Sequence, residues 1–182
     1  MIEKCLFFLV LCCFSLSAPA QTYATRSGTI SFYSDAPMEK IESHNQQVVS
    51  KLNPSTGSLD FAVLINAFQF DKQLMHKHFN SDYLESKRYP KATFQGTITN
   101  IQAIDFSKDG KYQVWVEGKL NLHGVEQAIS EKGSLIIQQG QIQASSKFTL
   151  SLTDFNVKVP VILKDKIAKT IQIEVKVNFS PG

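Results

Sequence analysis

The stretch KYQVWVEGKLNL, residues 111 to 122, alternates between apolar or small side chains and mostly polar ones along its whole length. The first set comprises Tyr112, Val114, Val116, Gly118, Leu120 and Leu122. A period of two over this length is typical of a β-strand with one face toward a core and the other toward water. The stretch therefore predicts a long strand in the wall of a folded sheet.

The same alternation returns along the chain and predicts an all-β protein of about eight strands. It is clear at 59–65, 142–152 and 171–179, and weaker at 28–34, 43–51, 92–103 and 125–138. Short turn sequences such as Asp109-Gly110 and His123-Gly124 separate these segments. Short turns favour antiparallel pairing, because parallel strands need long crossover connections.

A single segment, roughly residues 70–86, is expected to form a helix, in the connection between the third and fourth strands. One helix cannot cover the apolar face of so large a sheet, so the sheet must cover itself as a sandwich or a closed barrel. Closure also removes the edge strands that promote aggregation. We therefore expect a closed antiparallel β-barrel of about eight strands with one helix.

A barrel of about eight strands is either filled by its own side chains or holds one small ligand. The expected inward set mixes large residues with small ones, and includes Phe61, Phe148, Phe179, Gly96, Gly118, Gly133 and Ala144. The small residues either leave room for a ligand or interlock with the phenylalanines across the core. Composition alone does not decide between these alternatives.

The N-terminal segment is typical of a secretory signal peptide. A nearly unbroken apolar run at 5–17 precedes Ala18-Pro19-Ala20, which supplies the small residues that a signal peptidase reads. All three cysteines of the chain, at positions 5, 12 and 13, lie in this segment. The sequence thus predicts a cleaved signal peptide at 1–20, one domain at 21–182 without thiols, and a periplasmic or secreted location.

The remaining residues show no catalytic or metal-binding pattern. His76 and His78 are two positions apart and point in different directions on a helix, whereas zinc-binding pairs are three or four residues apart. His44 and His123 are expected at the start of a strand and in a turn. We therefore expect no enzyme activity, no cofactor and no metal site, and the net charge of +3 is too small to indicate a nucleic-acid partner.

Several stretches resemble the YceI-like family of periplasmic lipid-binding proteins. They are HFNSDYLESKRYPKATFQGTI at 78–98, LNLHGV at 120–125, KTIQIEVKVNF at 169–179, GTISF at 28–32 and LDFAVLINAFQF at 59–70. The resemblance covers residues 25–179 and is most specific at Tyr89-Pro90, Ala92 and Phe94. This chain departs from the family at its first strand, where it has Arg26-Ser27-Gly28 in place of an aspartate and a His-Ser pair.

The resemblance implies a lipocalin-like barrel whose cavity holds a polyisoprenoid or another long apolar chain, without enzymatic activity. The residues predicted to line this cavity are Phe61, Val63, Phe79, Phe94, Val114, Val116, Leu120, Phe148, Leu150, Ile173 and Val175. The helix is expected to form a lid that Pro90 ends. Tyr83, Arg88 and Tyr89 are expected to form the rim of the cavity.

The expected function is to carry or sequester a polyisoprenoid, a quinone or a fatty-acid-like molecule. Transient membrane contact and a homodimer are further expectations for such a protein. A filled barrel acting as a structural or interaction module is the first alternative. The second is an enzyme that acts on a lipid in the same cavity, which would need an inward-facing histidine or carboxylate, and the alternation places none on the central strands.

Overall fold

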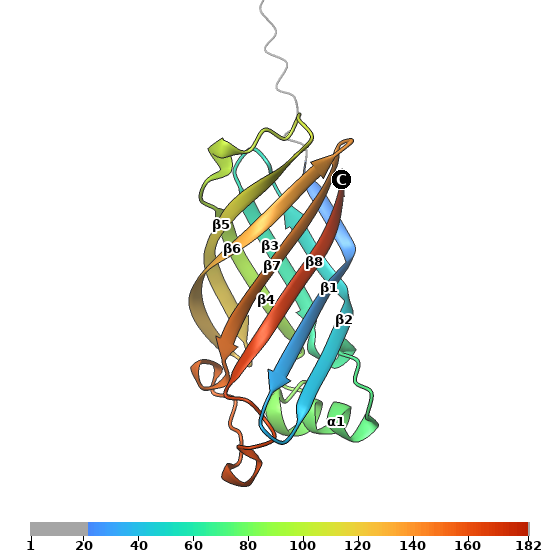
Figure 1. Ribbon diagram of the computed structural model, residues 1–182, viewed down its shortest axis with the longest axis vertical. Helices are drawn as coiled ribbons and strands as arrows, with labels where there is room; N and C mark the ends of the chain where they lie inside the picture. The colour runs from blue at the N-terminus through green and yellow to red at the C-terminus, as the bar shows by residue number, and fades with distance from the viewer. Residues whose placement is uncertain (1–21, 182) are drawn as a thin grey trace, which may run out of the picture.

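Eight antiparallel strands close into one barrel in the computed structural model, which describes residues 22–181 (Figure 1). The strands are β1 (Tyr23–Asp35), β2 (Lys40–Leu52), β3 (Ser58–Leu64), β4 (Lys91–Ile98), β5 (Gly110–Leu122), β6 (Val125–Gln138), β7 (Gln141–Ser151) and β8 (Thr170–Pro181). Each pairs with the next along the chain, and β8 closes on β1. This confirms the predicted fold, whereas the expected signal peptide at 1–20 lies outside the described residues.

Two-residue turns join β5 to β6 and β6 to β7. His123 and Gly124 have φ angles of 54° and 75°, and Gln139 and Gly140 have φ angles of 51° and 76°. Two successive positive φ values define the tight hairpin turn whose twist matches that of the paired strands. The turn chemistry that the sequence indicated therefore sets the register of this part of the barrel.

Two strands end earlier than the sequence predicted. The third strand ends at Leu64 and continues as the short helix η1 (Ile65–Ala67). The fourth ends at Ile98, before the short helix η3 (Ile101–Ala103). Asn100 explains the second difference, because its side-chain amide donates to the Gln113 carbonyl at 2.9 Å and accepts from the Trp115 amide at 2.9 Å.

The helix is also shorter than the predicted 70–86. The structure has α1 (Gln73–His78), followed by one π-helical turn, η2 (Phe79–Tyr83). The wider turn is closed by the Leu84 amide, which donates to the Phe79 carbonyl at 2.9 Å, and Glu85 then adopts a positive φ of 43°. The helical segment ends at Tyr83, so the expectation that Pro90 ends the helix is wrong, and Pro90 instead directly precedes β4, which begins at Lys91.

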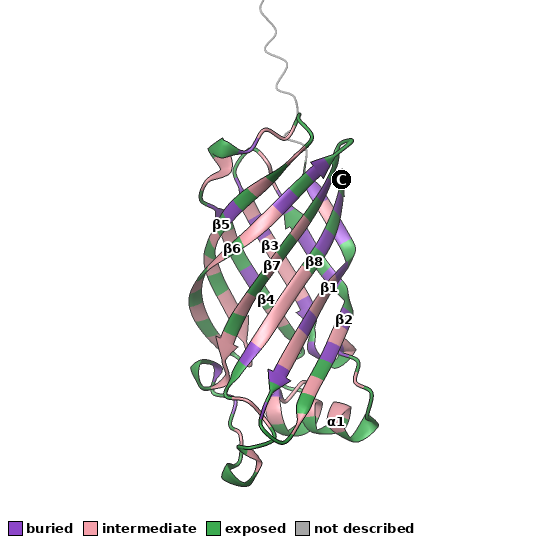
Figure 2. Ribbon diagram, viewed as in Figure 1, coloured by how far each residue is buried: buried purple, intermediate pink, exposed green. Residues whose placement is uncertain are grey.

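The two ends of the barrel differ. At the closed end, near the C-terminus, large side chains pack into a buried core. They are Tyr23, Leu52, Leu59, Ile98, Ile104, Val114, Leu135, Ile137, Ile142, Val177 and Phe179. At the other end, here called the mouth, lie α1, the β1–β2 turn and the connection 152–169 (Figure 1). Figure 2 shows buried and exposed residues alternating along the strands between these ends, as expected for a two-faced wall.

β6 and β7 are paired over only part of their length. These strands pair over Gly133–Gln138 and Gln141–Ser146, whereas β5 and β6 pair over almost their whole length. Residues 125–132 of β6 therefore leave one side of their backbone without a strand partner among the described residues. The short helix η4 (Leu152–Phe155) supports this region, since the Gln127 side chain donates to the Asp154 carbonyl at 2.9 Å.

Candidate functional site

An apolar cavity of about 780 Å³ lies inside the barrel, beneath the residues that fill the closed end. Leu52, Ile98 and Leu135 belong to both the filled core and the cavity lining, so they form its floor. At the mouth the lining reaches the exposed side chains of Leu74 and Lys158. Cavities of about 300–1,000 Å³ with mainly apolar walls are typical of small-ligand sites.

The residues predicted to line the cavity are brought together around it. The cavity lining includes Phe61, Val63, Phe79, Phe94, Val114, Val116, Leu120, Phe148, Leu150, Ile173 and Val175. They come from β3, β4, β5, β7, β8 and η2, because alternate positions of each strand point inward. Their contact with a ligand stays a prediction.

The small inward residues serve two different purposes. Gly96 and Gly118 are paired across β4 and β5, and the Phe94 ring lies against both. A methyl group at either position would overlap with this ring, so these two glycines interlock with a phenylalanine. Gly133 and Ala144 instead belong to the cavity lining. Both alternatives left open by the sequence therefore apply, in different parts of the barrel.

Four phenylalanines form a cluster at the mouth, of which the sequence analysis identified one. The Phe79 ring centroid lies 5.4 Å from that of Phe32, 5.5 Å from that of Phe68 and 5.0 Å from that of Phe70. These contacts hold η2, and with it α1, against the barrel. Ile30 and Phe32 both face inward, so the alternation of the first strand could have identified Phe32. Phe68 and Phe70 lie in a connection without regular periodicity, which gives no such signal.

The three residues expected at the rim separate into two groups. Tyr83 lines the cavity, whereas Arg88 and Tyr89 lie outside its lining. The Tyr89 ring packs against His123, with a centroid distance of 4.8 Å, and occupies the space that the missing side chain of Gly124 leaves free. Arg88 stacks over Tyr89 at 5.0 Å. These two residues therefore anchor the connection to the β5–β6 turn instead of surrounding the opening.

One carboxylate points into the cavity, contrary to the expectation from the alternation. Glu131 lies on the inward face of β6 between Ile129 and Gly133, and all three line the cavity. Burial in this apolar environment raises the pKa of the Glu131 carboxyl. The residue lies in the part of β6 that lacks pairing with β7. It places an ionisable group in the cavity wall.

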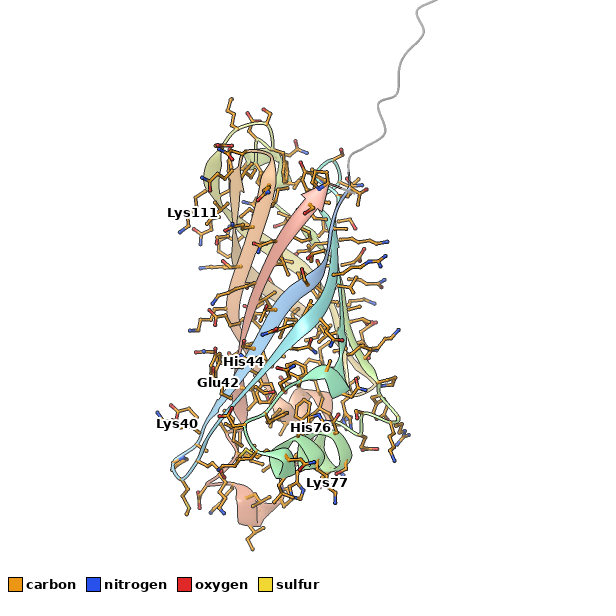
Figure 3. All side chains as sticks on the ribbon, turned by 90° about the vertical axis from the view of Figure 1, so that its right-hand side faces the viewer. Lys40, Glu42, His44, His76, Lys77 and Lys111 are labelled. Carbon is orange, nitrogen blue, oxygen red and sulfur yellow. The ribbon has the colours of Figure 1, made fainter. Side chains whose placement is uncertain are left out.

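The mouth carries charged side chains, in contrast to the interior. Lys72 pairs with Glu39 at 3.4 Å, and His78 Nδ1 lies 2.6 Å from Asp82 Oδ2. Hydrogen bonds from Ser81 and His78 lower the pKa of Asp82. Figure 3 shows other charged and polar residues of this end, including Lys40, His76 and Lys77, with Lys111 far away toward the closed end. A ligand with a polar head and an apolar tail matches this division.

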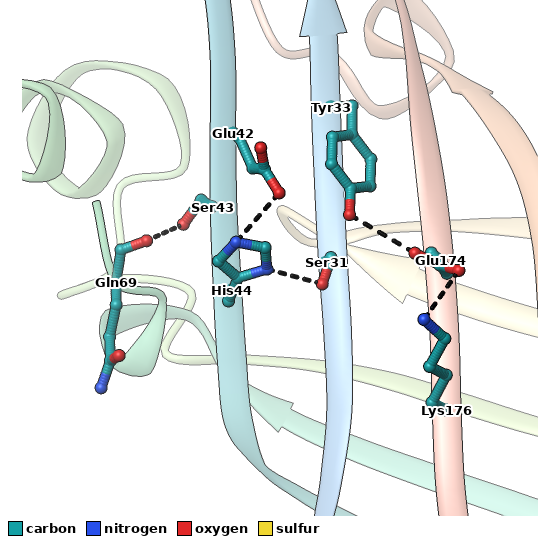
Figure 4. Close-up of polar contacts among 8 residues, drawn as sticks. All are labelled: Ser31, Tyr33, Glu42, Ser43, His44, Gln69, Glu174 and Lys176. Atoms are coloured by element: carbon teal, nitrogen blue, oxygen red, sulfur yellow. Dashed lines mark hydrogen bonds and ion pairs between the residues drawn. The ribbon is translucent and has the colours of Figure 1, made fainter. Parts of the chain in front are cut away.

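A serine, a histidine and a glutamate are aligned on the outer wall (Figure 4). His44 Nδ1 lies 2.8 Å from Ser31 Oγ, and its Nε2 lies 3.0 Å from Glu42 Oε1. Nucleophilic catalysis also needs an accessible hydroxyl and donors for an oxyanion. Ser31 is only 6% exposed, and it points away from the cavity that its neighbours Ile30 and Phe32 line. The alignment therefore joins β1 to β2 and lies outside the cavity.

A second pair of polar contacts on the same outer wall joins β1 to β8. The Tyr33 hydroxyl donates to Glu174 at 3.4 Å, and Lys176 pairs with Glu174 at 3.0 Å (Figure 4).

In the described part of the chain, no group of three or more His, Cys, Asp or Glu residues is placed to hold a metal ion. The helices between residues 22 and 181 include none that is long and apolar enough to cross a membrane.

The closed antiparallel wall and the apolar cavity open at one end define a lipocalin-like β-barrel. The model of the YceI-like domain matches residues 22–179, and the chain belongs to this family. The match covers every strand almost completely, so the family assignment applies to the whole described barrel.

Solved structures with the same fold share little sequence with this chain. A polyisoprenoid-binding domain from Saccharophagus degradans, implicated in plant cell wall breakdown, is 12% identical with a TM-score of 0.77, covering 90% of this chain and 99% of that one. BcnA from Burkholderia cenocepacia is 17% identical with a TM-score of 0.68, covering 84% and 96% respectively. The YceI protein from Campylobacter jejuni is 18% identical with a TM-score of 0.55, covering 75% and 80%. The comparison with curated proteins gives no match.

Proposed function

We propose that this protein is an exported carrier that binds a polyisoprenoid or a similar long-chain apolar lipid inside the barrel. The observation that carries the proposal is the cavity of about 780 Å³, with an apolar wall, a filled floor and charged side chains at the mouth. Such a cavity favours a molecule that enters tail first and leaves its head at the mouth.

The length of the barrel supports an elongated ligand. β5 has 13 residues, and β1 and β2 have the same number. At about 3.3 Å per residue and a tilt of about 40°, such strands give a barrel roughly 30 Å tall. The filled core occupies one end of this height. The height that remains is long enough for part of an extended chain.

Affinity would come mainly from the burial of the tail. Each buried CH₂ group contributes about 0.8 kcal/mol, less the cost of ordering the chain. The Saccharophagus degradans domain with the same fold is a polyisoprenoid-binding domain, which supports an isoprenoid ligand for this protein. A quinone or a fatty-acid-like molecule offers the same kind of apolar surface. We therefore expect selectivity for tail length more than for head-group chemistry.

The N-terminal sequence supports export. Its apolar run and the Ala18-Pro19-Ala20 site are typical of a cleaved signal peptide, which would leave a chain that begins at Gln21. Such a chain contains every strand of the closed barrel. A periplasmic or secreted carrier could move an insoluble lipid through water between membranes.

Native mass spectrometry of the chain that begins at Gln21, followed by organic extraction, tests the proposal. We expect a long-chain apolar molecule bound in stoichiometric amount, and the same spectrum measures whether two chains associate. Protein that is purified empty and also takes up no added prenyl lipid or quinone would contradict the proposal. The filled-barrel alternative would then apply to the whole interior.

A further inference from the structure

We propose that the mouth carries a docking tip for the surface of an anionic lipid bilayer. The tip is the segment 158–169, which contains the short helix η5 (Val161–Leu163) and projects beyond the strands (Figure 1). The cavity and its ligand are the subject of the proposed function, whereas docking concerns a separate surface. Docking can be measured without any knowledge of the ligand.

Apolar exposure is concentrated at this end of the molecule. Among the described residues, the most exposed large hydrophobic side chains are Ile162 at 88%, Val161 at 81%, Met38 at 71% and Leu74 at 63%. The other exposed ones, on the wall of the barrel, reach no more than 44%. All four belong to the mouth, because they lie in the tip, the β1–β2 turn and α1. An apolar group of this kind is typical of an interaction surface.

The tip is an ordered structure that presents its apolar pair outward. The Leu163 amide donates to the Pro160 carbonyl at 2.9 Å, and the Ile167 amide donates to the Leu163 carbonyl at 3.0 Å. The tip is also tied to the first hairpin, since the Met38 amide donates to the Asp165 carbonyl at 2.8 Å and the Ala168 amide donates to Ser34 Oγ at 2.9 Å. Exposure of Val161 and Ile162 therefore follows from a defined backbone.

The charge of the tip favours an anionic partner. The segment contains one acidic residue, Asp165, and four lysines, which are Lys158, Lys164, Lys166 and Lys169. Among residues 22–181, none of these four ammonium groups lies within ion-pairing distance of a carboxylate. Two other lysines of the mouth are neutralised locally, since Lys40 pairs with Asp35 and Lys72 with Glu39. Basic residues around exposed apolar side chains match a membrane surface with anionic lipids.

The position of the tip links docking to the cavity. Lys158, Pro160, Leu163 and Lys166 are part of the cavity lining at the mouth. Insertion of Val161 and Ile162 into the head-group region would therefore bring the opening against the bilayer. A chain could then pass between bilayer and cavity with little exposure to water, and this last step rests on the proposed function.

Vesicle sedimentation tests the docking directly. We expect the chain that begins at Gln21 to bind vesicles of phosphatidylcholine with phosphatidylglycerol, to bind pure phosphatidylcholine weakly, and to lose binding at high salt. Replacement of both Val161 and Ile162 by Asp should weaken binding by about tenfold or more, because two apolar side chains no longer insert. Trp115→Asp is the matched control, since Trp115 is exposed on the wall of the barrel.

A spectroscopic variant locates the contact without removing it. In a Trp115→Phe background, Ile162→Trp places one tryptophan at the tip. Brominated acyl chains in anionic vesicles should quench its fluorescence. Absence of vesicle binding, binding that is unaffected by the Asp substitutions, or binding without quenching would each overturn the proposal. A cavity-blocking variant such as Val116→Trp should still dock, which separates a failure of docking from a failure of lipid carriage.

Discussion

Glu85 and His123 are joined beside the cavity, with Oε1 of the glutamate 3.2 Å from Nε2 of the histidine. The His123 side chain is only 10% exposed, and its Nδ1 lies 3.1 Å from the Phe155 carbonyl oxygen. The β5–β6 turn thus connects two segments that are distant in sequence, the one after α1 and the one after β7. Tyr89 completes this contact by packing on the turn.

The packing of Tyr89 on Gly124 predicts a specific loss of stability. Gly124→Ala would place a methyl group against the Tyr89 ring and would also strain a residue with a φ of 75°. We expect the free energy of unfolding to fall by about 2–4 kcal/mol from these two effects. Chemical denaturation measures the change. Gly140→Ala is the control, because Gly140 has nearly the same φ but open space around it. Equal losses in both variants would show that the Tyr89 contact contributes nothing.

Blocking the cavity should separate binding from folding. Val116→Trp or Leu120→Trp would fill part of the cavity, since both residues line it. We expect lipid uptake to fall strongly, with a stability cost of about 1–3 kcal/mol from overpacking. Glu117→Trp adds the same bulk on the exposed face of the same strand and should bind normally. Uptake that persists in a folded Val116→Trp variant would mean that this part of the cavity holds no ligand.

Glu131 predicts a pH-dependent change in stability. Its pKa is raised in the folded state by burial, so the folded protein holds this proton more tightly than the unfolded chain does. The carboxylate therefore destabilises the fold as pH rises above the unfolded value of about 4.3, and the penalty disappears at lower pH. We expect Glu131→Gln to raise the melting temperature at neutral pH but not in acid. Glu117→Gln, on the outer face, serves as the control, and an equal effect of both at neutral pH would contradict the prediction.

The incomplete pairing between β6 and β7 predicts uneven hydrogen exchange. Amides of residues 125–132 that point away from β5 have no strand partner among the described residues. Hydrogen exchange followed by mass spectrometry should show faster exchange there than in residues 133–137 of the same strand, which pair on both sides. Uniform protection along β6 would mean that this part of the wall is closed in solution. Lipid in the cavity should slow exchange at 125–132 if it passes beside Glu131.

The strands could be predicted because their signal is local. Alternation in residues such as Val114, Val116 and Leu120 reports that one face of a strand meets a core, whichever strand lies next to it. Together with short turns and one helical segment, this was enough to indicate a closed antiparallel barrel. Glu131 occupies an inward position in the alternation of β6. It was not predicted to line the cavity, because inward positions are usually apolar.

The inward-facing positions of the wall, and a helical segment followed by Tyr89-Pro90, could be predicted from the sequence. Tertiary structure alone decided that Phe32, Phe68 and Phe70 meet Phe79 at the mouth, and that Tyr89 rests on Gly124. It also decided that one end of the barrel is filled and that Ile162 projects from the other. The reason is physical: a strand's two faces follow from neighbours two residues apart, whereas these contacts join segments whose meeting depends on register and on closure of the whole barrel.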